Sequence, residues 1–254
     1  MEQVAQSSTA PSPRRRDWPR AWRALRNLIA DPERTDQVFE IIGALSGNAF
    51  DRAFERFAAT REGRRLLAER PSLLATLSDR AALHAMPAGS FGRAYAEFME
   101  AGALEAGGLV EADAMASERF ADQQPEDPDS RYFDDRLRDM HDLWHVLTGY
   151  GRDEAGEAAN LAFTLGQVWN LGIAAIVAAG AIVGPKDLAF TWPRYLYRAW
   201  QRGRHAALLS AAPYEELLQL PLDQVRRRLD IEPARQTHPN GIVVANRGQE
   251  PQFV

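Results

Sequence analysis

The stretch YFDDRLRDMHDLWHVLTGYGRDEAGEAA, residues 132–159, decides the fold expected for this chain of 254 residues. A spacing of three and four residues places side chains on one face of an α-helix. Apolar residues recur at that spacing at Phe133, Leu137, Met140, Trp144 and Leu147. We therefore predict one helix from Tyr132 to Leu147 with this face in the core. The sequence TGYG, residues 148–151, ends that helix, so a second helix follows the turn.

The same stretch carries histidines and acidic residues in a pattern suited to a metal ion. His141 and His145 are four residues apart, which places them one helical turn apart, with Asp142 on the adjoining arc. The glycine-rich turn lets the next helix present Glu157, which would otherwise lie roughly 18 Å along the same axis. We predict that His141, Asp142, His145 and Glu157 hold one divalent metal. The alternative interpretation of two histidines at this spacing is a pair of polar residues at the edge of the core.

The rest of the chain is also patterned as helices. Runs with strict two-residue alternation are nearly absent, so the predicted fold class is all-α, a single helical domain with the metal site between two helices. We expect a disordered tail over 1–17, the helical domain over 18–230 and an irregular tail over 231–254. The first helix is amphipathic and basic and is suited to a membrane surface. Its apolar stripe consists of Trp18, Trp22, Leu25 and Ile29, with Arg20, Arg23 and Arg26 off the stripe.

Proline, glycine and capping residues predict the other boundaries. We expect helices to begin at Asp31-Pro32, at Pro71-Ser72 and between Pro87 and Ser90, and one to stop at Gly107-Gly108. A loop is expected over Asp122 to Ser130, a helix after Pro185 interrupted by Pro193, and a last helix around Tyr214 to Leu229.

The segment from Leu161 to Gly184 is the longest apolar run. Its cleanest part, residues 171–184, has fourteen residues, whereas a membrane span needs about twenty. We predict one buried helix lining an apolar cavity near Glu157. Small residues would make room there, at Gly172, Ala174, Ala175, Ala178, Ala179 and Gly180.

The composition limits the function. A formal net charge of −5 argues against nucleic acid as the main partner. The absence of cysteine excludes disulfides, thiolate metal ligands and a cysteine nucleophile. Two histidines with two carboxylates suit zinc, iron, manganese or cobalt.

Other charged motifs have simpler interpretations. Asp134, Asp135 and Asp139 lack the spacing of a prenyl-transfer motif and predict a solvated helix face. The His-Asp pair lacks the ligand set of an HD phosphohydrolase, because His84 is the sole upstream histidine. The run Arg226 to Arg228 predicts a solvated face. The segment from Arg194 to Arg204 interleaves cations and aromatic rings, which suits either a membrane interface or a helix with its aromatics packed inward.

The run HDLWHVLTGYGRDEAGEAA, residues 141–159, closely resembles the motif of a ubiquinone (coenzyme Q) biosynthesis family, the fourth named protein of that pathway in eukaryotes. Similarity extends over residues 18–230. The resemblance implies a helical protein that binds a metal, usually taken as zinc, through the residues matching His141, Asp142, His145 and Glu157. The absence of a presequence of mitochondrial type indicates a bacterial member.

The resemblance also implies a function. It implies action on a polyprenylated benzoquinone precursor at a membrane face, with oxidative replacement of the ring carboxylate by a hydroxyl. The alternative that it leaves open is a lipid-binding scaffold that organises the other ubiquinone-biosynthesis enzymes without chemistry. We accordingly expect a homo-oligomer at the cytoplasmic side of the inner membrane, with the precursor, the membrane surface and the other pathway enzymes as partners.

Overall fold

The computed structural model describes residues 15–31, 34–102, 127–184 and 191–234. These residues form helices and no strand, apart from one isolated bridge between Ser90 and Pro221, so the all-α prediction is confirmed. The first seven helices are α1 (Trp18–Ala30), α2 (Thr35–Leu45), α3 (Ala49–Ala59), α4 (Arg61–Glu69), α5 (Leu73–Ser78), α6 (Arg80–Ala85) and α7 (Phe91–Ala101). The others are α9 (Pro128–Asp139), α10 (His141–Thr148), α11 (Glu154–Gln167), α12 (Leu171–Val183), α13 (Thr191–His205), the short 3-10 helix η3 (Leu209–Ala211), α14 (Tyr214–Leu217) and α15 (Leu222–Arg228).

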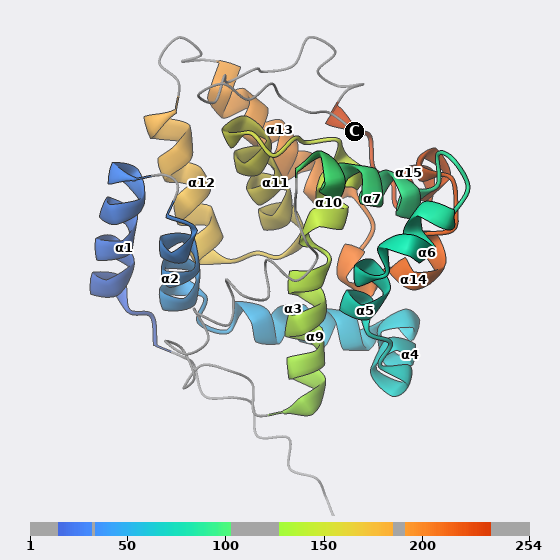
Figure 1. Cartoon of the computed structure of the whole chain (residues 1–254). Helices are drawn as coiled ribbons and strands as arrows, with labels where there is room; N and C mark the ends of the chain where they lie inside the picture. The colour runs from blue at the N-terminus through green and yellow to red at the C-terminus, as the bar shows by residue number, and fades with distance from the viewer. Residues whose placement is uncertain (1–14, 32–33, 103–126, 185–190, 235–254) are drawn as a thin grey trace, which may run out of the picture.

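Three groups of buried side chains hold the helices together. The largest joins α7, α10, α11, α13, α14 and α15. A second lies between α3, α4 and α9. The third joins α1 and α2 to the first half of α12, which lie side by side in Figure 1. The helices α10 and α11, which carry the predicted metal ligands, therefore belong to the largest core.

The helices α11 and α13 pack with their backbones unusually close. A Cβ atom added to Gly203 would lie 2.1 Å from the carbonyl oxygen of Phe163. One added to Gly166 would lie 2.5 Å from the carbonyl oxygen of Trp200. Glycine at both positions permits this close contact. The contact fixes α13 against the helix that carries Glu157.

The prediction of one continuous helix from Tyr132 to Leu147 is wrong. The segment is two helices, α9 and α10, separated at Met140. Met140 keeps helix-like dihedrals, with φ −84° and ψ −2°, so the chain changes direction without unwinding. The predicted face nonetheless packs inward, because Phe133, Met140, Trp144 and Leu147 are buried.

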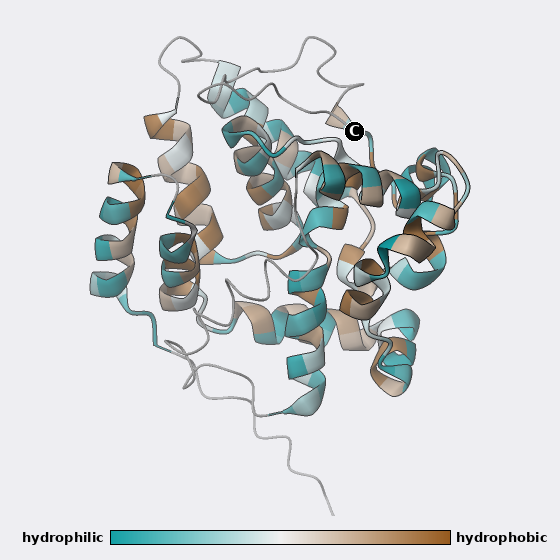
Figure 2. Ribbon diagram, viewed as in Figure 1, coloured by the Kyte–Doolittle hydropathy of each residue, from teal (hydrophilic) through white to brown (hydrophobic). Residues whose placement is uncertain are grey.

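The apolar run from Leu161 to Gly184 is likewise two helices, α11 and α12. Asn170 begins α12, where its side-chain oxygen accepts hydrogen bonds from the backbone N–H groups of Gly172 and Ile173. The prediction that the run is buried fails for the end of α12, where Ile182 is 84% exposed. Figure 2 shows α12 apolar along its length. Among the described residues, no helix has both the length and the apolar character that crossing a membrane requires.

Several smaller boundaries also differ from the prediction. The second helix begins at Thr35, and Asp31 ends α1 instead of starting α2. Pro193 lies within the first turn of α13 and does not interrupt it. The last predicted helix is two, α14 and α15, with Pro221 before the second.

Other boundaries agree with the prediction. Ser72 and Ser90 cap α5 and α7 as expected. By contrast, the loop predicted over Asp122 to Ser130 is wrong at its end, because Pro128 to Ser130 belong to α9. Residues 122–126 of that loop, Pro32 and the predicted stop at Gly107-Gly108 lie outside the described residues.

Candidate metal centre

The turn between α10 and α11 is set by two local signals. Gly149 adopts a left-handed conformation with φ 70°, and its N–H donates to the carbonyl of His145 at 2.8 Å, which ends α10. Asp153 then caps α11, because its carboxylate accepts from the N–H groups of Ala155 and Gly156, both at 3.1 Å. Glu157 therefore lies in the first turn of α11 and faces His145 of α10.

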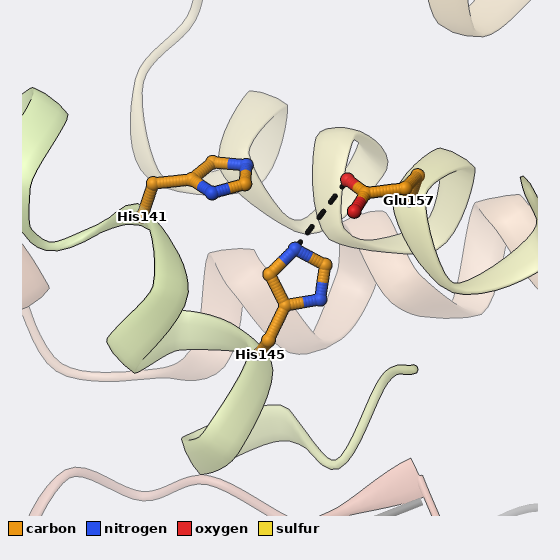
Figure 3. A group of neighbouring side chains, drawn as sticks. All are labelled: His141, His145 and Glu157. Carbon is orange, nitrogen blue, oxygen red and sulfur yellow. Dashed lines mark ion pairs between the residues drawn. The ribbon is translucent and has the colours of Figure 1, made fainter. Parts of the chain in front are cut away.

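This turn brings three of the predicted ligands together. One ligand atom from each of His141, His145 and Glu157 lies within 4.8 Å of the others. The two imidazole rings have centroids 5.0 Å apart. Figure 3 shows Nε2 of His145 directed at the Glu157 carboxylate, 3.4 Å away. Two side chains from α10 and one from α11 thus surround one point.

The buried nitrogen of His145 fits a metal ion. His145 is fully buried, and its Nε2 has no hydrogen-bond partner, since its contact with Glu157 lacks hydrogen-bond geometry. A buried polar atom without a partner is destabilising unless something else satisfies it. The side chains of His141 and Glu157 are 36% and 48% exposed, so an ion could reach the cluster. Imidazole and carboxylate are ligands that divalent metals accept.

Asp142 contacts His141. Its carboxylate oxygen lies 3.2 Å from Nδ1 of His141, which donates to it. Nδ1 of His145 donates in the same way to the carbonyl of Tyr150, also at 3.2 Å. Both imidazoles therefore have a hydrogen-bond acceptor on Nδ1 and leave the Nε2 lone pair for a metal, a common arrangement around metal-ligating histidines.

The electrostatics favour charged side chains in the cluster. Burial alone would lower the pKa of His145, but the Glu157 carboxylate outweighs it and raises that pKa. Burial would raise the pKa of Glu157, and attraction to His145 lowers it instead. The pKa of Asp142 is also lowered, since the hydrogen bond from His141 and nearby positive charge outweigh burial. The carboxylates are therefore ionised near neutral pH, as metal binding requires, and a bound metal would take the place of the proton that they favour on His145.

An aromatic ring and a cation stand beside the cluster. Phe98 of α7 stacks on His145 with ring centroids 5.8 Å apart. The guanidinium of Arg152 lies 4.9 Å from the centroid of Phe98 and contributes to the lowered pKa of Asp142. Neither residue was predicted from the sequence, because the prediction used the spacing of the two histidines and the acidic residues near them.

Arg226 was wrongly predicted to be solvated. It is buried, and its guanidinium donates to the carbonyls of Val146 and Leu147 at the end of α10. In the segment from Arg194 to Arg204, Tyr195 is buried and Tyr197 is exposed, so its aromatic residues divide between core and surface. Asp139 is nearly buried beside Arg138 and does not lie on a solvated face.

A family model described as coenzyme Q (ubiquinone) biosynthesis protein Coq4 matches residues 20–235. This chain belongs to the Coq4 family. Ubiquinone biosynthesis protein COQ4 homolog 1, mitochondrial, of Culex quinquefasciatus is 30% identical over 205 residues, 80% of this chain and 70% of that protein. The Bos taurus COQ4 homolog, also named mitochondrial, is 29% identical over 209 residues, 80% of this chain and 73% of its own length.

The fold is also shared with a solved structure. A Nostoc punctiforme PCC 73102 protein, named as a candidate for ubiquinone biosynthesis, superposes with a TM-score of 0.61. It is 21% identical, and the match covers 84% of this chain and 98% of that one. At this identity the likeness shows a shared helical fold and nothing more. The family predicted from the motif is thus confirmed, and three of the four motif residues form a group able to hold a metal.

Proposed function

We propose that this chain acts in ubiquinone biosynthesis through one divalent metal held by His141, His145 and Glu157. Asp142, which accepts from Nδ1 of His141 through one carboxylate oxygen, is proposed to supply its other oxygen as the fourth ligand. The observation that carries the proposal is the buried Nε2 of His145, which has no hydrogen-bond partner and faces Glu157, in a chain matched by the Coq4 family model over residues 20–235. Zinc is the metal that the family resemblance implies, and the ligand chemistry equally accommodates iron, manganese or cobalt.

The proposed reaction is oxidative decarboxylation of a polyprenylated, carboxylated phenol. A bound divalent metal would polarise the carboxylate or phenolate of this substrate. Per ring, one dioxygen is consumed, the carboxylate leaves as carbon dioxide, and the electron-rich ring supplies four electrons. Two of these electrons are lost when a hydroxyl replaces the carboxylate, and the other two when the hydroxylated ring is oxidised to its quinone form, so the products are the quinone, carbon dioxide and water. Zinc has no redox chemistry, so with zinc every electron comes from the phenol.

Residues around the cluster suit such a substrate. The buried ring of Phe98, stacked on His145, makes this side of the cluster apolar. The guanidinium of Arg152, next to Phe98, provides a positive charge for the ring carboxylate. We propose that the prenyl tail lies along α11 and α12, the two helices of the segment for which the sequence predicts an apolar cavity near Glu157.

Membrane attachment is proposed through α1. This helix packs on α2 with the small residues Ala21 and Ala24. Its large apolar side chains remain outside, since Trp18 is 58% exposed and Trp22 62% exposed. Arg23 and Arg26 of the same helix are also exposed. Exposed tryptophans beside basic residues are typical of helices that lie in a membrane interface.

Metal analysis tests the site. Protein purified without chelator should contain about one metal per chain by elemental analysis, and His145→Ala should lose it. His205→Ala is the matched control, because His205 is exposed and bonds only locally, to the carbonyl of Gln201. The metal content of Asp142→Asn and of Glu157→Gln then shows whether each carboxylate contributes to metal binding. Metal far below one per wild-type chain, or metal unchanged in His145→Ala, contradicts the assignment.

Turnover tests the chemistry. The loaded protein, incubated with a prenylated precursor labelled at its ring carboxylate, should release labelled carbon dioxide only with dioxygen present. Metal and precursor binding without carbon dioxide release would support the scaffold instead.

Vesicle binding tests the membrane proposal. Trp18→Ser with Trp22→Ser should abolish binding to anionic vesicles at low salt, whereas Trp169→Ser, which also removes a 60% exposed tryptophan, should retain it. Equal binding by all three proteins would refute attachment through α1.

A further inference from the structure

Two arginines from later in the chain hold the C-terminal end of α10. Arg226 of α15 donates to the carbonyl of Leu147 at 2.9 Å and to that of Val146 at 2.8 Å. Arg202 of α13 donates to the carbonyl of Thr148 at 3.2 Å. The last carbonyls of a helix have no partner within the helix, so these bonds satisfy them. An eight-residue helix that carries three of the four predicted ligands is thereby anchored at one end.

Arg202 also reaches the turn after α10. Its guanidinium hydrogen-bonds to the hydroxyl of Tyr150 and lies 4.9 Å from the centroid of the Tyr150 ring. Tyr150 is fully buried, and Tyr195 packs edge-on against it at 6.0 Å between centroids. Burial raises the pKa of Tyr150 to about 12, so its phenol stays neutral near pH 7 and accepts a hydrogen bond. The side chain of Tyr150 is therefore fixed by α13.

The backbone of Tyr150 is in turn the partner of His145. The Nδ1–H of His145 donates to the Tyr150 carbonyl at 3.2 Å. This bond selects the tautomer whose Nε2 carries a lone pair and faces Glu157. A continuous series of contacts thus runs from Arg202 through Tyr150 to the ligand nitrogen of His145.

We propose that Arg202 is a positioning residue for the metal centre, because its contacts with Tyr150 hold the carbonyl that orients His145. The inference rests on the proposed function, since it requires that the cluster binds metal. Removal of the hydrogen-bond partners behind metal-ligating histidines typically weakens metal binding about 10- to 100-fold. We expect a loss in that range for Arg202→Met.

Cobalt(II) titration of the full chain tests the proposal, with the absorption spectrum of the bound cobalt as a second readout. Arg202→Met and Tyr150→Phe should both bind cobalt more weakly and show altered spectra. Tyr150→Phe keeps the buried ring and removes only the hydroxyl that Arg202 contacts. Arg204→Met is the matched control, since Arg204 lies on the same helix with its guanidinium 5.1 Å from the Trp200 ring centroid, and it should bind as the wild type does.

NMR of the imidazole nitrogens in the metal-free chain at alkaline pH gives a readout that a general loss of stability would not produce. Wild-type His145 should carry its proton on Nδ1, whereas Arg202→Met should show a mixture of tautomers. If Arg202→Met does not fold, Tyr150→Phe carries the same test.

Wild-type cobalt affinity and tautomer in these variants would overturn the inference and leave the proposed function standing. A wild-type chain that binds no cobalt would overturn both.

Discussion

The buried ion pair between Arg136 of α9 and Glu215 of α14 should show a large asymmetry when its partners are removed singly. The guanidinium bonds both carboxylate oxygens, at 2.7 and 2.9 Å, and also the carbonyl of Ala212 at 3.1 Å. The Arg136 side chain is 1% exposed and that of Glu215 20% exposed. Glu215→Ala therefore leaves a buried cation with a single bond to Ala212, whereas Arg136→Met leaves a carboxylate that can turn toward water.

Removing one partner of a buried pair costs about 3–5 kcal/mol. Because Glu215 is partly exposed, we expect the low end for Glu215→Ala, about 3 kcal/mol of unfolding free energy. At about 2–4 °C per kcal/mol for a chain of this size, the Tm falls by roughly 6–12 °C. We expect about 1 kcal/mol for Arg136→Met, and about the same for the double variant, since an apolar replacement of both partners is often neutral.

Urea unfolding followed by circular dichroism at helix wavelengths measures all three variants against the wild type. The reasoning is refuted if Glu215→Ala costs no more than Arg136→Met, or if the double variant is less stable than Glu215→Ala. Either result would mean that the guanidinium is satisfied without its carboxylate.

Three further predictions concern single positions. Gly149→Ala should destabilise the protein by about 1–2 kcal/mol in urea unfolding, because φ 70° is costly for alanine. Its contrast in the same assay is Gly180→Ala on α12, which should stabilise the protein by up to about 1 kcal/mol, because alanine is favoured over glycine within a helix and its Cβ would meet no other atom. Gly203→Ala should cost at least about 1–3 kcal/mol in the same assay, since its Cβ would meet backbone that a side-chain rotation cannot move; no loss would contradict the close packing of α11 and α13. The pKa of Asp127 is lowered by the hydrogen bond from the Ser130 N–H, so its stabilisation is present above its ordinary pKa of 3.8 and is lost as pH falls through the lower folded value. Wild type should therefore lose stability relative to Asp127→Asn, which cannot titrate, on acidification below about pH 4, and a constant difference in acid titrations of unfolding would contradict this.

The sequence predicted the helical class and the chain turn at the metal centre well, because both depend on local chemistry. Gly149 and Asp153 end and begin helices through contacts within a few residues, so their roles can be inferred from residue type. The break at Met140 could not be inferred in the same way. Its dihedrals remain near helical, and the spacing of apolar residues is the same for one straight helix and for two that change direction.

The remaining errors concern contacts between distant parts of the chain. The residues next to Arg226 in the sequence do not distinguish it from an arginine exposed to solvent. Its burial is explained by the position of α10 beside α15, where it donates to two carbonyls of α10. On α1, the sequence identified the apolar stripe but not that Ala21 and Ala24, between the stripe residues, would make the contact with α2. The apolar run from Leu161 to Gly184 was predicted as one helix, because a single polar residue changes the mean hydropathy of such a run very little. That residue, Asn170, nevertheless decides where α12 begins, since its side chain caps the helix.

His141 and Glu157 lie only sixteen positions apart, on two helices that a short turn already joins. A metal that joins them closes a loop of the chain, and closing a flexible loop of this length costs roughly 2–3 kcal/mol of entropy. The turn already holds the two ends close together, so the metal adds little further stability to the whole chain. Its effect should therefore be local. Amide hydrogen exchange on loading with metal should slow across α10 and the first turns of α11 and change little in α1 to α4. Loss of the ion should then make α10 and the first turns of α11 more mobile while the other helices stay folded. The protein could therefore release and rebind its metal without global unfolding.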